Sequence, residues 1–291
     1  IGIFLLSRTV KDPFRQVAFG TFDQSVLECL NQQGHIASFF HHRPLRPEDL
    51  MHDNVLSFDA LIMTSGFASA ENIKLLRRLK LPVVLFGSGR FSDSVFHQVC
   101  YDYRPGFRLA LEHLTGLGHR SFMVAGTDNS ADRFQAIMSA ATELGLQENQ
   151  FDFSQTDQVN DKGQDFNIMG GRAIGNYFYQ NRNRFSAILS TSDYLTYGIV
   201  AQLREQQLEP GRDYALISYD NFESRNLLIY GTEPIITAIT HPIEKMAEQT
   251  VKIAVEEALS PSATTRLVLV PANEFIVRSS SLYQNPEKIK E

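Results

Sequence analysis

The sequence repeats one local pattern: a short apolar segment that suits a β-strand, followed by a longer segment with helical patterning. In the first series, strands are expected at residues 1–6, 35–40, 60–64 and 82–86, with helices at residues 14–33 and 70–79. A second series has strands at residues 121–125, 187–190 and 215–218, with helices at residues 132–144, 170–181 and 193–206. Such alternation is typical of parallel strands joined by right-handed crossovers, and it predicts doubly wound α/β sheets.

The length of 291 residues suits two such lobes of roughly 100–150 residues each. A late helix at residues 243–259 and extended segments within residues 265–277 are expected to make the lobes discontinuous in sequence. We expect a first lobe of residues 1–117 plus about 240–265, and a second lobe of residues 118–239 plus about 266–281. Because ligands bind beyond the carboxyl ends of strands in open α/β sheets, the cleft between the lobes is the expected binding site.

Charge and composition narrow the class of protein. The net charge is −6 and basic residues are scattered among acidic ones, so we expect no DNA-binding surface within this chain. No apolar run reaches the ~18 residues that a membrane span needs. Two cysteines in apolar segments favour buried free thiols in a reducing compartment over a disulfide. The chain opens without Met on an apolar segment, from which we expect that a leader or a domain once preceded it.

Several polar residues follow predicted strands. Asp12 suits the start of a helix in which Phe14 either faces the cleft or packs on the sheet. Arg133 lies in a first helical turn, where its charge opposes the helix dipole. Its forked guanidinium can hold sugar ring or carboxylate oxygens in two bonds, and the alternative is a solvated surface side chain.

Two further strand ends carry carboxylates. Either Ser192 or Asp193 suits the N-cap of the helix that follows. Asp220 could accept two hydroxyl hydrogen bonds, as polyol recognition requires, or could simply form a turn with Asn221. The sequence contains no G-x-S-x-G or H-E-x-x-H motif, and His41 and His42 lack further ligands at metal spacing. We therefore expect a binding protein without cofactor or metal, and not an enzyme.

Five segments occur in an order that is typical of one family: DYRPG (102–106), HLTGLGHR (113–120), SYDN (218–221), PIITAITHP (234–242) and VRSSS (277–281). Together they resemble the effector-binding domain of the lactose-repressor/galactose-repressor (LacI/GalR) transcriptional regulators, essentially from end to end. The resemblance implies a periplasmic-binding-protein-like type I fold with three crossover segments between the lobes. It also implies a cytoplasmic homodimer whose operator DNA is bound by an N-terminal helix-turn-helix domain that is absent from this chain.

Carried over by position, the family's ligand contacts fall on several residues of this sequence. These are Leu6, Ser7, Asp12, Phe14, Arg133, Ser192 and Asp220, with Phe166 as the implied aromatic platform. Two departures matter: Ser192 stands where the family usually has Asn, and Pro105 stands where some members place a sugar-binding acid. The implied pocket is therefore not a copy of the lactose or purine pocket.

The resulting expectation is a repressor domain that senses a sugar or a related small metabolite. The alternative is a periplasmic sugar-binding protein of a transport system, which would share the lobes and the cleft. The apolar turn 226–230 is expected either at a two-fold dimer interface or in a short buried helix.

Overall fold

The computed structural model describes residues 2–8, 13–42, 58–65, 70–88, 90–91, 95–126, 132–153, 168–225 and 231–283. The chain forms two compact units. Unit 1 consists of Ile1–Tyr101 and Pro242–Val270, and unit 2 of Asp102–His241 and Pro271–Glu291. The chain therefore passes between the units three times, and each unit holds a six-stranded sheet. The predicted fold class, two largely parallel sheets with three crossovers, is confirmed.

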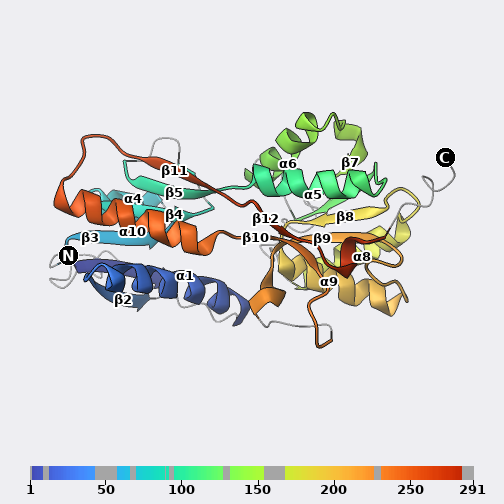
Figure 1. The fold of residues 1–291 in the computed structure, drawn as a ribbon, viewed down its shortest axis with the longest axis horizontal. Helices are drawn as coiled ribbons and strands as arrows, with labels where there is room; N and C mark the ends of the chain where they lie inside the picture. Colours follow the sequence, from blue (N-terminus) through green and yellow to red (C-terminus); the bar gives the residue numbers. More distant parts are fainter. Residues whose placement is uncertain are drawn as a thin grey trace. The chain divides into compact units, whose positions relative to one another are not determined.

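Unit 1 is built on a sheet with the strand order β11-β5-β4-β3-β1-β2. Its strands are β1 (Gly2–Arg8), β2 (Ile36–His42), β3 (Ala60–Thr64), β4 (Val83–Gly87), β5 (His97–Asp102) and β11 (Leu267–Pro271). Its helices are α1 (Pro13–Gln32), α4 (Ala70–Leu76) and α10 (Ile243–Leu259). Helices α1 and α10 pack against each other, and α10 also contacts β3 and β4 (Figure 1). The stacked rings of Phe22 and Phe86, with centroids 3.6 Å apart, lie in this apolar layer.

One buried carboxylate ties the end of α10 to the neighbouring strands of unit 1. The side chain of Glu257 is 2 % exposed and accepts hydrogen bonds from the main-chain N–H of Ser262 at 2.7 Å and from the guanidinium of Arg266. The His97 ring also lies beside this carboxylate, with Nε2 3.5 Å from Oε2 of Glu257. These bonds outweigh the effect of burial and lower the pKa of Glu257 to about 2.

Unit 2 is built on a sheet with the strand order β12-β10-β9-β8-β6-β7, in which β12 runs antiparallel to β10. Its strands are β6 (Phe122–Ala125), β7 (Phe151–Asp152), β8 (Ala187–Ser190), β9 (Ala215–Asp220), β10 (Thr237–Thr240) and β12 (Glu274–Ile276). Helices α5 (Arg104–Gly116) and α6 (Asp132–Glu143) cover one face (Figure 1). Helices α8 (Ile168–Gln180) and α9 (Asp193–Glu205) cover the other, and short 3-10 turns complete the unit at η2 (Glu148–Gln150), η3 (Phe222–Arg225) and η4 (Ser279–Ser281).

The motifs HLTGLGHR and VRSSS, far apart in sequence, contact each other in unit 2. His113 Nε2 lies 2.9 Å from Ser281 Oγ, and His119 Nε2 lies 2.9 Å from the carbonyl oxygen of Tyr283. Ser280 is fully buried: its hydroxyl donates to the carbonyl of Leu216 at 2.7 Å and accepts the N–H of Thr237 at 2.8 Å. These two family-like motifs therefore fasten the end of the described chain to the sheet.

Most predicted elements are present within a few residues of their expected bounds, and the turns that follow α1 and α6 contain Gly34 and Gly145, both with positive φ. The sequence pattern missed β5, α5, β7 and β10. The contacts also divide the chain after Tyr101, ahead of the expected boundary at residue 117. The reason is that α5, which lies between these two positions, packs on α6, β10 and β12.

Candidate functional site

Several titratable side chains of unit 2 lie together at the carboxyl end of β9. Asp220, the last residue of β9, has φ of 106°, and Asn221 follows with φ of 59°. Positive φ is uncommon for residues other than glycine, and its occurrence twice in succession marks a position that neighbouring contacts hold in place. We call Arg133, Asp193, Asp220 and His241 the strand-end cluster.

Arg133, near the start of α6, contributes the cation of the cluster. Its Nη2 lies 3.8 Å from Oδ1 of Asp220, and its Nη1 donates to the carbonyl oxygen of Thr191. The guanidinium carbon lies 4.7 Å from the ring centroid of Tyr219 and 5.2 Å from that of Tyr103. Such cation–π contacts favour the charged guanidinium. The side chain is only 20 % exposed, so Arg133 is not a solvated surface residue.

Asp220 is held from two further sides. His241 Nε2 lies 2.5 Å from Oδ1 of Asp220, and the main-chain N–H of Asp193 donates to Oδ2 at 3.4 Å. Burial by itself would raise the pKa of Asp220, but the bond from His241 and the charge of Arg133 keep that pKa below its ordinary value. Asp220 is therefore an ionised acceptor beside a cation.

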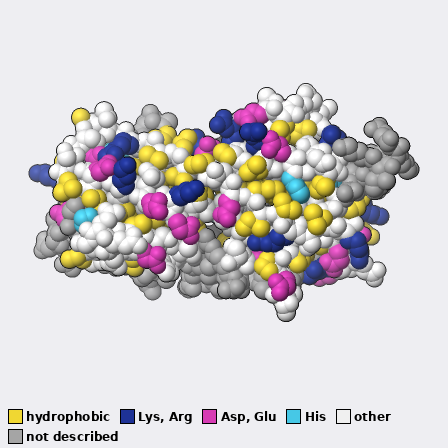
Figure 2. Space-filling view, viewed as in Figure 1, with side chains coloured by type: hydrophobic (Ala, Val, Ile, Leu, Met, Phe, Trp, Pro, Cys, Tyr) yellow, Lys and Arg dark blue, Asp and Glu magenta, His cyan; other side chains and the backbone are white. Residues whose placement is uncertain are grey.

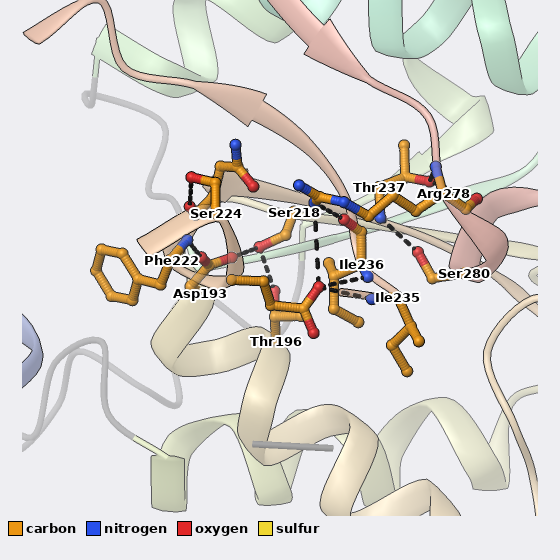
Figure 3. Close-up of polar contacts among 12 residues, drawn as sticks. Asp193, Thr196, Ser218, Phe222, Ser224, Ile235, Ile236, Thr237, Arg278 and Ser280 are labelled. Atoms are coloured by element: carbon orange, nitrogen blue, oxygen red, sulfur yellow. Dashed lines mark hydrogen bonds and ion pairs between the residues drawn. The ribbon is translucent and has the colours of Figure 1, made fainter. Parts of the chain in front are cut away.

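Asp193 is the first residue of α9 and lies next to Asp220. Its carboxylate accepts the hydroxyl of Ser218 and, at 2.5 Å, the main-chain N–H of Phe222 (Figure 3). Burial and the nearby charge of Asp220 raise the pKa of Asp193 to about 8, against the effect of these two bonds. Burial and the charge of Asp220 therefore both oppose ionisation of Asp193, whereas Asp220 stays the ionised member of the pair.

A second buried carboxylate, Glu223 of η3, lies close by. Its Oε2 accepts the main-chain N–H groups of Ile235 at 2.9 Å and Ile236 at 2.7 Å, and Arg278 Nη1 lies 4.0 Å away (Figure 3). Burial nevertheless raises the pKa of Glu223. These bonds connect η3, which follows Asp220 in sequence, to the residues directly before β10.

The structure brings together three of the predicted site residues. Arg133 and Asp220 are adjacent, and Ser192 precedes Asp193. Ser192 is the N-cap of α9, and its hydroxyl accepts the N–H of Tyr194 at 3.3 Å, which decides between the two expected caps.

Leu6 and Ser7 lie in β1 and Phe14 in α1, in segments whose side chains the structure does not describe. Asp12, Phe166 and residues 226–230 lie outside the described residues. Ligand contact by any of these residues stays a prediction.

Sequence reasoning missed His241, Tyr103 and Thr191, which surround Arg133 and Asp220. His241 directly follows β10, so it occupies the same kind of strand-end position that pointed to Asp220. The missing signal was β10 itself, a strand of four residues that the pattern did not predict.

A pocket of about 600 Å³ lies at the opposite, amino-terminal edge of the same sheet. Arg120, Arg182 and Arg184 line it. Arg120 donates to the carbonyl of Thr115 and Arg182 to that of Tyr179, and both carbonyls lie in the last turns of helices. Basic side chains at helix C-termini offset the helix dipole, so Arg120 and Arg182 have a structural role that needs no ligand.

Surface charge and possible metal-binding groups bear on the expectations from the sequence. Figure 2 shows basic and acidic side chains interspersed on the face in view, in keeping with the net charge of −6. Within the described ranges, no group of three or more His, Cys, Asp or Glu could hold a metal ion. No helix in the described part of the chain is long and apolar enough to cross a membrane.

Residues 111–281 match the model of a family described as the periplasmic binding protein-like domain. A helix-turn-helix-type transcriptional regulator from the aml 5' region of Streptomyces limosus is 26 % identical over 185 residues, which cover 62 % of this chain and 49 % of that protein. The chain thus spans about half the length of this relative. A LacI-family regulatory protein from Chloroflexus aggregans has the same fold, with a TM-score of 0.74, 22 % identity and coverage of 96 % of this chain and 98 % of that chain. A LacI-family regulator from Enterococcus faecium with bound ribose has a TM-score of 0.72, 20 % identity and coverage of 97 % and 98 %.

Proposed function

Since the chain belongs to the family of periplasmic binding protein-like domains, we propose that it is the effector-binding part of a DNA-binding transcriptional regulator that senses a sugar. The observation that carries the proposal is the Arg133–Asp220 pair at the carboxyl end of β9, where α/β sheets bind ligands. The relative from S. limosus is a regulator by name, and the E. faecium structure holds ribose. Both support a regulator over the transport alternative. The protein is a sensor and not an enzyme.

In this proposal the sugar binds at the strand-end cluster. Asp220 accepts hydroxyl hydrogen bonds, and Arg133 donates to ring or hydroxyl oxygens. Pairing of the two groups before the ligand arrives reduces the ordering cost of binding. A partner copy of the chain and operator DNA, bound through a domain outside these 291 residues, complete the regulator. The sugar switches it only if it binds the two DNA-binding states with different affinity.

A thermal-shift titration tests this proposal. Ribose, other monosaccharides and a disaccharide are added separately to the wild-type chain, and we expect at least one to raise Tm in proportion to the logarithm of its concentration. Arg133→Ala should lose that shift, because a charge-assisted bond contributes about 1.5–3 kcal/mol. Arg212→Ala, which removes an exposed arginine of the same unit, should keep it. An unchanged shift in Arg133→Ala would reject the assigned site, and no response to any sugar would reject the effector class.

A further inference from the structure

The strand-end cluster contains a residue whose contacts fit a role in effector binding. His241 Nε2 lies 2.5 Å from Oδ1 of Asp220, and the His241 ring packs edge-on against Tyr219, with centroids 4.7 Å apart and an interplanar angle of 80°. Tyr219 is the same ring that lies under the guanidinium of Arg133. His241 therefore contacts the carboxylate directly and the cation through one shared aromatic ring.

The position of His241 along the chain also supports a role in holding Asp220. The main-chain pairing of β9 with β10 ends at the Asp220–Thr240 pair. Beyond it, two side-chain bonds continue the connection: Asn221 Nδ2 to Thr240 Oγ1 at 2.9 Å, and His241 to Asp220. His241 is also the last residue of unit 2 before the chain enters unit 1 at Pro242. The bond thus joins the carboxylate to the start of a crossover segment.

Asp220 needs such support because its backbone is in an unfavourable conformation. With φ of 106°, the residue persists only if its surroundings overdetermine it. Oδ1 carries the short bond from His241, whereas Oδ2 accepts only the long 3.4 Å bond from Asp193 among the described residues. An ionised carboxylate can accept at about four lone-pair sites, so capacity for a ligand hydroxyl remains.

We propose that His241 is a positioning residue for effector binding, which holds the Asp220 carboxylate in the orientation that accepts the hydroxyl groups of a sugar. This inference rests on the function proposed above. His241 acts by donating one hydrogen bond through Nε2, so a side chain with a similarly placed donor can replace it, and an apolar side chain of similar size cannot.

Three variants test the role, with sugar affinity and the free energy of unfolding measured for each. His241→Leu should weaken binding of the sugar that shifts the wild type by about tenfold or more, the loss of one charge-assisted bond. His241→Gln, which keeps a donor, should bind within about threefold of the wild type. Thr240→Val is the matched control: it removes the neighbouring Asn221–Thr240 bond and leaves Asp220 untouched, so it should keep wild-type affinity.

The outcomes distinguish the positioning role of His241 from the proposed sugar-sensing function. If the wild type binds a sugar and His241→Leu binds it equally well, the positioning role is overturned while the proposed function stands. Equal losses in His241→Leu and His241→Gln would also overturn it, because steric packing alone would explain them. If no sugar binds, the proposed function fails, and a double-mutant cycle of His241→Leu with Asp220→Asn on unfolding still decides the pairing. Additive effects in that cycle would overturn it.

Discussion

The contact between α8 and α9 makes Gly198→Ala a sharp test of the structure. Gly198 of α9 faces Gly171 of α8, and the two helices pack backbone to backbone. A Cβ at residue 198 would meet the carbonyl oxygen of Ile168, the Cα of Gly171 at 2.7 Å and the main-chain nitrogen of Arg172 at 2.8 Å. All three are backbone atoms, so no side chain can rotate away and the helices must separate.

The expected magnitude follows from two opposing effects. Overpacking of a tight contact costs roughly 1–3 kcal/mol, and the upper value applies here because only the backbone can yield. Alanine in place of glycine within a helix contributes about 1 kcal/mol in the other direction. The net result is a loss of about 2 kcal/mol in the free energy of unfolding. For a unit of this size, that loss lowers Tm by roughly 4–8 °C.

Thermal and urea unfolding of Gly198→Ala against Gly116→Ala measure this. Gly116, at the end of α5 in the same unit, has nothing within 4 Å of a built Cβ. The same substitution there should leave stability unchanged or raise it by a few tenths of a kcal/mol. A Gly198→Ala protein as stable as the Gly116→Ala protein would show that α8 and α9 do not approach as closely as described.

The remaining predictions concern buried polar groups. Ser280→Ala removes the acceptor of the buried Thr237 N–H and should cost about 1–3 kcal/mol in urea unfolding, whereas Ser279→Ala, on the exposed serine beside it, should cost almost nothing. Equal losses of unfolding free energy in the two variants would mean that Ser280 does not make the buried hydrogen bonds described. Glu257 has a folded pKa of about 2, below the ~4.3 of an unfolded glutamate, so its stabilisation is present above pH ~4.3 and is lost as the pH falls toward 2. The difference in unfolding free energy between the wild type and Glu257→Gln should therefore reach up to roughly 3 kcal/mol near neutral pH and vanish near pH 2, and a difference independent of pH would contradict the cause assigned.

The strands that the sequence pattern predicted are those made mostly of apolar residues. The segment β5 was missed because it opens with His97 and Gln98, which are polar and buried. Gln98 satisfies its amide by accepting the N–H of Phe91 at 2.9 Å and donating to its carbonyl at 3.0 Å. Buried polar residues need partners, and no pattern local to the strand shows whether a distant residue supplies them.

The same limit applied at the candidate site. The sequence placed β9 up to Ser218, but the strand continues to Asp220 because partners from α6, α9 and the end of β10 satisfy its polar side chains. Asp220 was predictable because it lies two residues after a predicted strand, and Arg133 because it lies in the first turn of a predicted helix. Tyr103 and Thr191 were not, because each acts on Arg133 across the fold.

These contacts also explain why the resemblance is strong for the scaffold and weak for the effector. Four residues of the motifs make hydrogen bonds between segments that are distant in sequence: His113, His119, Ser280 and Ser281. At such points few other side chains fit the spacing of the backbone and satisfy its polar groups. A ligand, in contrast, is selected by side chains that can change without moving the backbone. In the proposed site, Tyr103 lies against the guanidinium of Arg133, and His241 is bonded to the carboxylate of Asp220. We therefore predict that substitutions of Tyr103 and His241 change the effector preference of the proposed site before they change the fold.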